Sequence, residues 1–175
     1  MFLGTFQLKL EDKGRLSIPV RYREILQEKY QLRSPSVDLE IILCYIGPHI
    51  SAYPRIEWDR LADALSEATA LPGLHQDARK LEHMLFGNAA ECPLDTQGRV
   101  VIPPSLRSKA QLNSEITIVG HNRYFELWNR HAWEEYDASL QGHELLEIAQ
   151  KIADLRDARI GARPSLFDDG LRSRL

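Results

Sequence analysis

Two stretches of the sequence, EDKGRLSIPVRYR at residues 11–23 and DTQGRVVIPPSLR at residues 95–107, decide the fold because they repeat one pattern. Both contain an acidic residue, then a Gly-Arg pair, an Ile-Pro pair and a final arginine at the same spacing. Such self-similarity is typical of a supersecondary unit that occurs twice in one chain. We therefore expect two related modules.

The repeat extends beyond these stretches. YPRIEW at residues 53–58 matches WNRHAW at residues 128–133, and the apolar stretch from Ile41 matches ITIV at residues 116–119. Each unit has roughly 45 to 55 residues and can hardly bury an apolar face alone. We expect the two copies to pack into one pseudo-symmetric domain with a shared core.

Local patterns predict strands and turns around each motif. Apolar and polar residues alternate over 6–10, which is typical of a half-buried strand. Gly14 and Gly98 stand where a turn needs a positive φ or a close backbone approach. Pro19 and Pro103 end the short second strand and can begin a helix.

Other segments predict helices. Apolar residues recur at three and four residues over 58–68, and a second helix is expected from 75 to 86, ended by Gly-Asn. Further apolar stripes occupy 133–140 and 145–155. The last residues, 161–175, show no periodicity and are expected to be flexible.

Composition limits the class of protein. The chain has 175 residues, of which 43% are hydrophobic and 27% charged, and its longest apolar run, 41–46, is far shorter than the ~20 residues that span a bilayer. MFLG at residues 1–4 lacks the layout of a signal peptide. We expect a cytoplasmic protein without a membrane segment. Cys44 is expected in the core, whereas the environment of Cys92 stays open, and neither suggests zinc or a disulfide.

The charges are segregated along the chain. The formal net charge of -3 argues against a protein that coats nucleic acid indiscriminately. Residues 9–29 have six basic side chains against four acidic ones, while residues 126–158 have three against eight. The first hairpin is thus mildly basic, although such blocks are equally typical of solvated faces.

The Gly-Arg-x-x-Ile-Pro hairpins resemble AbrB-type swapped-hairpin DNA-binding domains. With MFLGTFQLKLEDKGRLSIPVRYR at 1–23, GNAAECPLDTQGRVVIP at 87–103 and VGHNRYFELW at 119–128, the chain resembles the MraZ family of transcriptional regulators. The resemblance implies an α+β fold in which two pseudo-symmetric AbrB-like modules form one barrel-like core with flanking helices. The implied organisation is module 1 at 5–53, a helical linker at 54–81, module 2 at 82–126, C-terminal helices at 127–160 and a flexible tail at 161–175.

The resemblance also implies a function. It implies a cytoplasmic, nucleoid-associated regulator that binds double-stranded DNA at repeated boxes upstream of the division and cell-wall gene cluster. Such a regulator usually represses that cluster and its own gene, and it forms ring-like homo-oligomers. The family's Asp-x-x-x-Arg motif is complete at Asp95 and Arg99, whereas the first half has Glu11 ahead of Arg15 and an extra acid at Asp12.

Arginine suits the recognition of a DNA sequence because its planar guanidinium group can contact guanine or phosphate through two hydrogen bonds. Our hypothesis is that Arg15 and Arg99 read DNA from the hairpin tips. The supporting basic residues are Lys13, Arg21, Arg23 and Arg107. Alternatively, the Glu11–Arg15 and Asp95–Arg99 pairs are salt bridges that fix each hairpin, and an acid that orients its arginine toward DNA would reconcile the two interpretations.

One module offers few basic groups, so linked modules in an oligomer should bind more tightly than a monomer. Boxes spaced by about 10 bp or its multiples would suit neighbouring subunits. Trp58 and Trp133 are candidates for subunit contacts, although core packing is the commoner fate of tryptophan.

Two other classes of protein are compatible with parts of the sequence, an enzyme and a protein-interaction module. The sequence has no HExxH, GxGxxG, P-loop or GxSxG motif, and its six histidines lack metal-ligand spacing, so no enzyme, cofactor or metal is expected. The second class is a protein-interaction module of antitoxin type, in which the C-terminal segment would occlude a toxin.

Overall fold

The computed structural model describes residues 1–29, 39–140 and 148–152. The chain divides into two compact units, Met1–Glu134 and Glu135–Leu175. The second unit contains the end of a helix that begins in the first unit and a helical segment at 148–152. The predicted loop at 31–38, the tail at 161–175 and most of the stripe at 145–155 lie outside the described residues.

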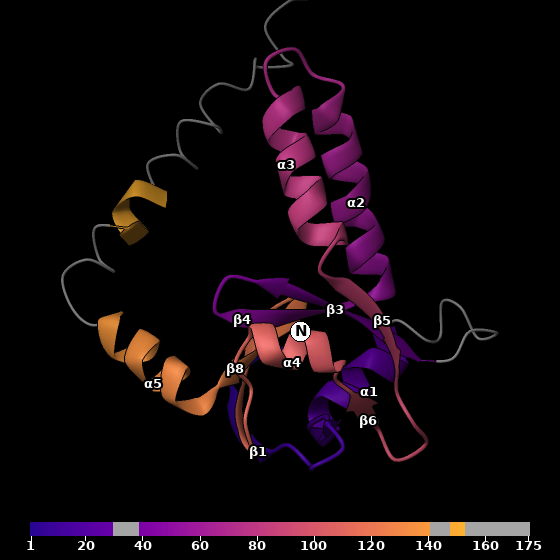
Figure 1. Ribbon diagram of the computed structural model, residues 1–175, viewed down its shortest axis with the longest axis vertical. Coiled ribbons are helices and arrows are strands. Elements are labelled where there is room, and N and C mark those ends of the chain that lie inside the picture. The colour runs from indigo at the N-terminus through magenta and orange to yellow at the C-terminus, as the bar shows by residue number, and fades with distance from the viewer. Residues whose placement is uncertain (30–38, 141–147, 153–175) are drawn as a thin grey trace, which may run out of the picture. The chain divides into compact units, whose positions relative to one another are not determined.

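The described strands form two antiparallel sheets (Figure 1). The larger sheet has six strands in the order β1-β7-β8-β4-β3-β5, and β2 and β6 pair separately as a two-stranded ribbon. The strands are β1 (Thr5–Lys9), β2 (Arg15–Ser17), β3 (Glu40–Ile46), β4 (His49–Pro54), β5 (Ala89–Pro93), β6 (Arg99–Val101), β7 (Glu115–His121) and β8 (Tyr124–Asn129).

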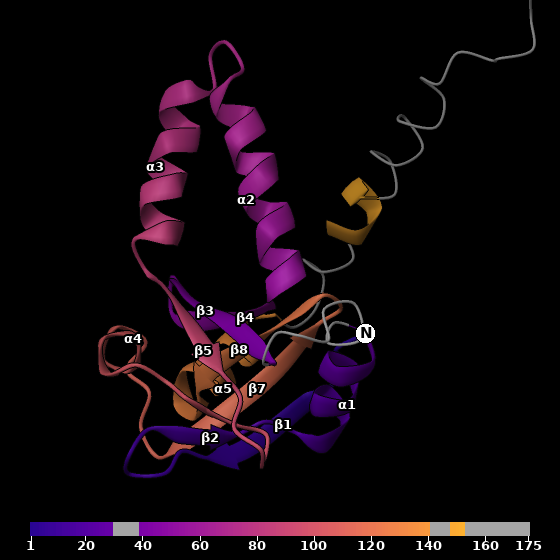
Figure 2. The ribbon, with the colours of Figure 1, turned by 90° about the vertical axis from the view of Figure 1, so that its right-hand side faces the viewer.

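The helices follow the strands in a repeated order. They are α1 (Val20–Lys29), α2 (Arg55–Thr69), α3 (His75–Phe86), α4 (Pro104–Lys109) and α5 (Arg130–Ser139). α1 and α4 begin directly after the Ile-Pro pairs, as predicted, and the helix expected at 75–86 is confirmed. Figure 2 shows α2 and α3 side by side, rising from the part of the sheet that holds β3 and β4.

The register of the strands has the pseudo-two-fold symmetry of the repeat. Leu16 and Val100 are equivalent in the two copies, and they face each other across β2 and β6. Ser51 and Glu126 are also equivalent, and they face each other across β4 and β8. Equivalent residues meet in this way only where a two-fold axis passes between them. The axis therefore runs between β2 and β6 and between β4 and β8.

The first strand of each repeat pairs with the other repeat. β1 runs antiparallel to β7 with Leu8 opposite Ile116, and β5 runs antiparallel to β3 with Cys92 opposite Ile41. All four residues lie in or against one hydrophobic core that both repeats build. The prediction of a shared core is confirmed, because the first strand of each repeat pairs with a strand of the other repeat and both repeats supply the core residues.

The expected barrel-like core is wrong for the described part of the chain. β1 and β5 are the two edges of an open sheet, and the ribbon closes no barrel with it. The physical reason is the length of β2 and β6, which have three residues each before Pro19 and Pro103. Proline cannot donate a ladder hydrogen bond, so strands this short cannot bridge the two edges. The α+β class is confirmed, and the module boundaries stay predictions.

β3 explains the apolar run that the sequence contains at 41–46. Ile41 and Leu43 lie in the core shared by the repeats, whereas Ile42 and Cys44 lie in a second cluster beneath α2 and α3. A strand buried on both faces cannot alternate between apolar and polar residues. Cys44 is fully buried, as predicted, and Cys92 is also buried with a free thiol.

Candidate nucleic-acid interface

The outer face of the β2–β6 ribbon brings the two motif arginines together. Arg15 lies opposite Val101, and Ser17 lies opposite Arg99. Side chains of directly opposed residues point to the same side of a sheet, and alternate residues share a face. The middle residue of each strand is fully buried, so all four of these side chains belong to the outward face. Val101 is 54% exposed there.

The turns that lead into the ribbon have the same backbone in both repeats. Gly14 has φ +77° and Gly98 has φ +72°, a region that side-chain-bearing residues rarely adopt. In the first turn the Glu11 N–H donates to the Arg15 carbonyl at 3.0 Å. The Gly14 N–H donates to the Glu11 carbonyl at 2.7 Å, and both bonds recur in the second turn at 2.8 Å. The prediction from the glycines is confirmed.

Each motif arginine is paired with its motif acid. Arg15 Nε donates to Glu11 Oε2 at 2.8 Å, and Arg99 Nε donates to Asp95 Oδ2 at 2.8 Å. These are the salt bridges that the sequence left as an alternative. The pairs are partly exposed and contribute little to stability, but they fix the direction of the guanidinium group. The remaining guanidinium nitrogens are therefore held in a defined orientation at the ribbon.

Asp95 also holds the backbone of its turn. Its Oδ1 accepts the N–H groups of Gln97 and Arg99, both at 2.9 Å. The backbone N–H of Arg99, followed by its side chain, lowers the pKa of Asp95 below the ordinary value. Glu11 is one methylene longer, and in the described part of the chain its carboxylate makes neither backbone bond. The replacement of aspartate by glutamate in the first repeat thus has a structural consequence.

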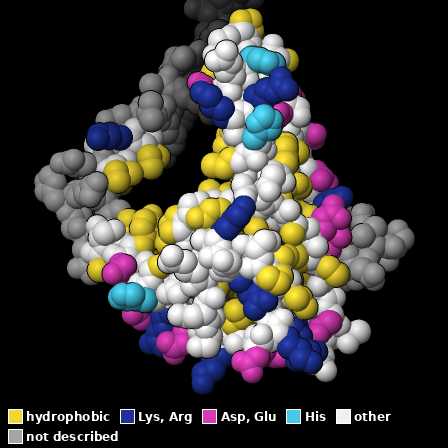
Figure 3. All heavy atoms as spheres, viewed as in Figure 1, with side chains coloured by type: hydrophobic (Ala, Val, Ile, Leu, Met, Phe, Trp, Pro, Cys, Tyr) yellow, Lys and Arg dark blue, Asp and Glu magenta, His cyan; other side chains and the backbone are white. Residues whose placement is uncertain are grey.

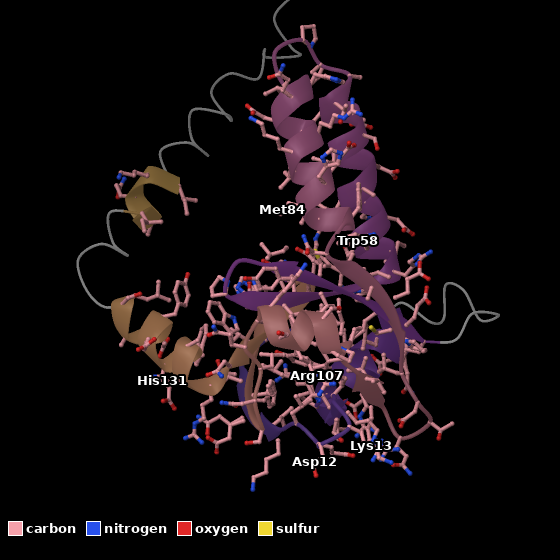
Figure 4. The ribbon with its side chains drawn as sticks, in the orientation of Figure 1. Asp12, Lys13, Trp58, Met84, Arg107 and His131 are labelled. Atoms are coloured by element: carbon pink, nitrogen blue, oxygen red, sulfur yellow. The ribbon has the colours of Figure 1, made fainter. Side chains whose placement is uncertain are left out.

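The two helix arginines lie over the turns of the opposite repeat. Arg23 extends from α1, and its NH1 group donates to the carbonyl of Gln97 at 3.0 Å. Arg107 extends from α4, and a Cβ atom placed on Gly14 would lie 2.7 Å from its Cζ atom. Figure 4 shows Arg107 beneath α4, on the side of the molecule where Lys13 lies. Both arginines are half-buried.

The remaining basic residues of the predicted surface are exposed. Lys13 lies in the first turn and Arg21 in the first turn of α1. Asp12 is exposed beside Lys13, and Figure 3 shows basic and acidic side chains mixed along the lower edge of the view rather than one continuous basic patch. Any DNA contact here would depend on a few well-placed groups more than on bulk charge.

Sequence reasoning missed two features, one on the ribbon and one in the larger sheet. Ser17 and Val101 lie on the ribbon face with the arginines, and only the pairing of β2 with β6 reveals this. The buried carboxylate of Glu126 was also missed, and it accepts a hydrogen bond from Trp128 Nε1 at 2.8 Å. His49 and His121 lie 3.3 and 3.2 Å from it, and burial lowers the pKa of His49. No sequence signal brings these residues together.

The described residues contain no group of three or more His, Cys, Asp or Glu side chains that could hold a metal ion. None of the helices in the described residues is long and apolar enough to cross a membrane.

Trp58, a candidate for subunit contacts, is only 9% exposed and packs with Tyr53 and Phe86 inside the chain. The apolar surface of Trp58 is therefore buried by contacts within the chain and offers little area to a second subunit.

The chain matches a family model described as "MraZ protein, putative antitoxin-like" over residues 1–81 and 85–156. It is 37% identical over 156 residues to a protein of Roseiflexus castenholzii named transcriptional regulator MraZ, with 89% of this chain and 99% of the relative covered. The protein of the same name in Azotobacter vinelandii is 36% identical, with 89% and 94% covered. That of Oenococcus oeni is 32% identical, with 88% and 98% covered.

Proposed function

The chain belongs to the MraZ family, and on this premise we propose that it is a transcriptional regulator that binds double-stranded DNA through the outer face of the β2–β6 ribbon. The relatives' name supplies the regulatory role, and the ribbon supplies the contact surface. A two-stranded β-ribbon fits the major groove of B-DNA, where base edges differ between all four base pairs.

The main observation in support of this proposal is that Arg15 and Arg99 share one face of the ribbon and are related by the pseudo-two-fold axis. An arginine fork binds guanine O6 and N7 through two hydrogen bonds, which lysine cannot do. Val101 lies directly opposite Arg15, and Ser17 lies directly opposite Arg99. A serine hydroxyl can contact several base edges, whereas an exposed valine suits a thymine methyl group.

The acids act through the arginines. A carboxylate near phosphate is repelled, so Glu11 and Asp95 orient Arg15 and Arg99 and do not contact DNA. Each acid occupies Nε, which leaves the terminal nitrogens of the guanidinium for bases. Lys13 and Arg21 are exposed and would contact phosphates, which positions the ribbon but carries no sequence information.

We propose a homo-oligomer, ring-like as in the family resemblance. One chain presents a single ribbon with two motif arginines, so several linked ribbons are needed for tight binding. Ribbons of neighbouring subunits would then suit boxes repeated at about 10 bp or its multiples. The proposed targets are the division and cell-wall gene cluster and the protein's own gene. The protein would associate with the nucleoid and repress transcription of both.

A salt-titrated mobility-shift assay tests the proposal. The probe is the DNA upstream of the protein's own gene, with a scrambled fragment as control. We expect wild-type protein to retain the native fragment, with affinity falling as salt rises, and the Arg15→Ala/Arg99→Ala double variant to lose it.

The matched control is Lys80→Ala, which removes one basic side chain that is 76% exposed on α3. It should bind like the wild type. Retention of the native fragment by the double arginine variant at wild-type affinity would overturn the assignment of the ribbon.

A further inference from the structure

We infer that Arg107 and Arg23 are positioning residues that act across the repeats. Arg107 of the second repeat holds the turn that carries Arg15, and Arg23 of the first repeat holds the turn that carries Arg99. The inference rests on the proposed function, because it concerns how the two ribbon arginines are presented to DNA.

The first observation is the fit of Arg23 over the second turn. A Cβ atom on Gly98 would lie 1.9 Å from Arg23 Cδ and 2.8 Å from its Nε, far inside contact distance. The side chain therefore lies directly on the glycine, and its NH1 group is hydrogen-bonded to Gln97 in the same turn. The turn cannot move toward α1 without displacing this arginine.

The second observation is the equivalent contact in the other repeat. A Cβ atom on Gly14 would lie 2.7 Å from Arg107 Cζ and 2.9 Å from its Nε. One backbone hydrogen bond also joins each turn to the other repeat, and the two bonds are related by the pseudo-two-fold axis. Ile102 donates to the Gly14 carbonyl at 2.9 Å, and Ile18 donates to the Gly98 carbonyl at 3.1 Å. Each turn is thus held by a side chain and a backbone group of the other repeat.

The third observation is the burial of both Nε atoms. The Nε atoms of Arg23 and Arg107 are buried and have no hydrogen-bond partner among the described residues. A buried donor without a partner is unfavourable and persists where packing fixes the side chain. The burial of both Nε atoms therefore indicates side chains that are held in place by packing at the turns.

These contacts explain the final arginine of the repeated motif. It lies at the same distance after the Gly-Arg pair in both copies, yet it contacts the glycine of the other copy. A small turn glycine and a long helix side chain are complementary only across the two-fold axis. The two repeats are therefore coupled, and damage to one helix should impair the reading arginine of the opposite repeat.

Double-mutant cycles on DNA affinity test the coupling. The probe is the fragment upstream of the protein's own gene, and the variants combine Arg107→Met with Arg15→Ala and, separately, with Arg99→Ala. We expect Arg107→Met alone to weaken binding about tenfold. It should add less than about twofold to Arg15→Ala but its full effect to Arg99→Ala. The mirror-image set with Arg23→Met should couple to Arg99 and not to Arg15.

Additive effects with both arginines, or coupling within one repeat, would overturn the inference. Two further readouts separate positioning from a direct phosphate contact. Loss of a phosphate contact lowers the slope of log binding constant against log salt concentration by about one. An Arg107→Lys variant would restore such a contact. A lost positioning contact leaves the slope unchanged, and lysine does not restore it because an ammonium group cannot lie flat over Gly14.

Amide chemical shifts test the cross-repeat contact without DNA. Arg107→Lys is the milder variant if Arg107→Met does not fold. It should shift the amides of residues 13–15 more than those of residues 97–99, and the opposite pattern would overturn the inference. If Arg15→Ala and Arg99→Ala both bind DNA like the wild type, the proposed function fails, whereas the amide shifts still decide the contact.

Discussion

The two motif turns, at residues 11–15 and 95–99, have the same backbone but different anchors. Both have a glycine at positive φ, the same two backbone hydrogen bonds and an acid paired with Arg Nε at 2.8 Å. Only the second acid, Asp95, also accepts two backbone N–H groups of its own turn. A repeated motif can therefore keep its DNA-contacting arginine while the rigidity of the turn differs between the copies. We expect Arg99 to be more firmly oriented than Arg15.

Replacing either turn glycine with alanine should lower the stability of the protein more than any other change proposed below. Gly98→Ala should lower the free energy of unfolding by on the order of 3 kcal/mol, because the residue keeps a positive φ and its Cβ meets Arg23 Cδ. Gly14→Ala should cost less, about 2 kcal/mol, because its nearest atom is the end of the Arg107 side chain. Urea denaturation of both variants measures this, and a larger loss for Gly14→Ala would contradict the packing at the turns.

The next effect concerns the acids and DNA affinity. Asp95→Ala removes three hydrogen bonds from its turn and Glu11→Ala removes one, so Asp95→Ala should weaken binding to the upstream fragment more, about tenfold against about threefold. Mobility-shift titrations at fixed salt measure both variants. Equal losses would mean that the backbone bonds of Asp95 do not contribute to reading.

Glu11→Asp should make the first turn more like the second. The shorter carboxylate can reach the backbone N–H groups of its own turn, as Asp95 does. We expect DNA affinity to rise by about twofold, together with slower hydrogen exchange of the Arg15 amide. Lower affinity and faster exchange would show that the glutamate is the better anchor in this repeat.

A pH titration distinguishes the turns without mutation. The folded pKa of Asp95 lies below its unfolded value, so its contribution to stability is complete about one unit above the unfolded pKa, at about pH 5 and higher, and is lost as the pH falls through the folded pKa. The amides of Gln97 and Arg99 should report a titration midpoint below the ordinary value of an aspartate. A midpoint at or above that value would contradict the bonds to Asp95.

Substitutions of the residues opposite the arginines should have modest effects on DNA affinity. Val101→Ser should weaken binding by about fourfold if the valine contacts one methyl group, and the loss should concentrate at boxes with thymine at one position. Ser17→Val is the symmetric control. A uniform loss over all base substitutions of the box would remove Val101 from sequence reading.

Local features of the fold could be predicted from the sequence, whereas the partners of each element could not. Gly14 and Gly98 predict turns, and the apolar periodicity over 58–68 predicts α2, because both signals lie within a few neighbouring residues. The pairing of β2 with β6 joins segments far apart in the chain. Nothing in a three-residue strand specifies its partner. The barrel-like core was expected from the family resemblance, and the short strands do not form it.

The candidate site shows the same limit. The repeated acid and arginine could be predicted because both lie in one short motif, and the salt bridges Glu11–Arg15 and Asp95–Arg99 are present. The positions of Arg23 and Arg107 over the opposite turns could not be predicted, because they depend on the two-fold packing of the repeats. Val101 was missed for the same reason.

Photo-cross-linking from one added cysteine tests the DNA face most directly. Ser17→Cys places a photoactivatable label on the ribbon, and Ser66→Cys places it on the exposed side of α2. Cys44 and Cys92 are buried, and burial raises the pKa of each thiol to about 11, so neither competes for the label. We predict cross-links to the upstream fragment from position 17 and none from position 66. Cross-links from position 66 alone would contradict DNA binding by the ribbon.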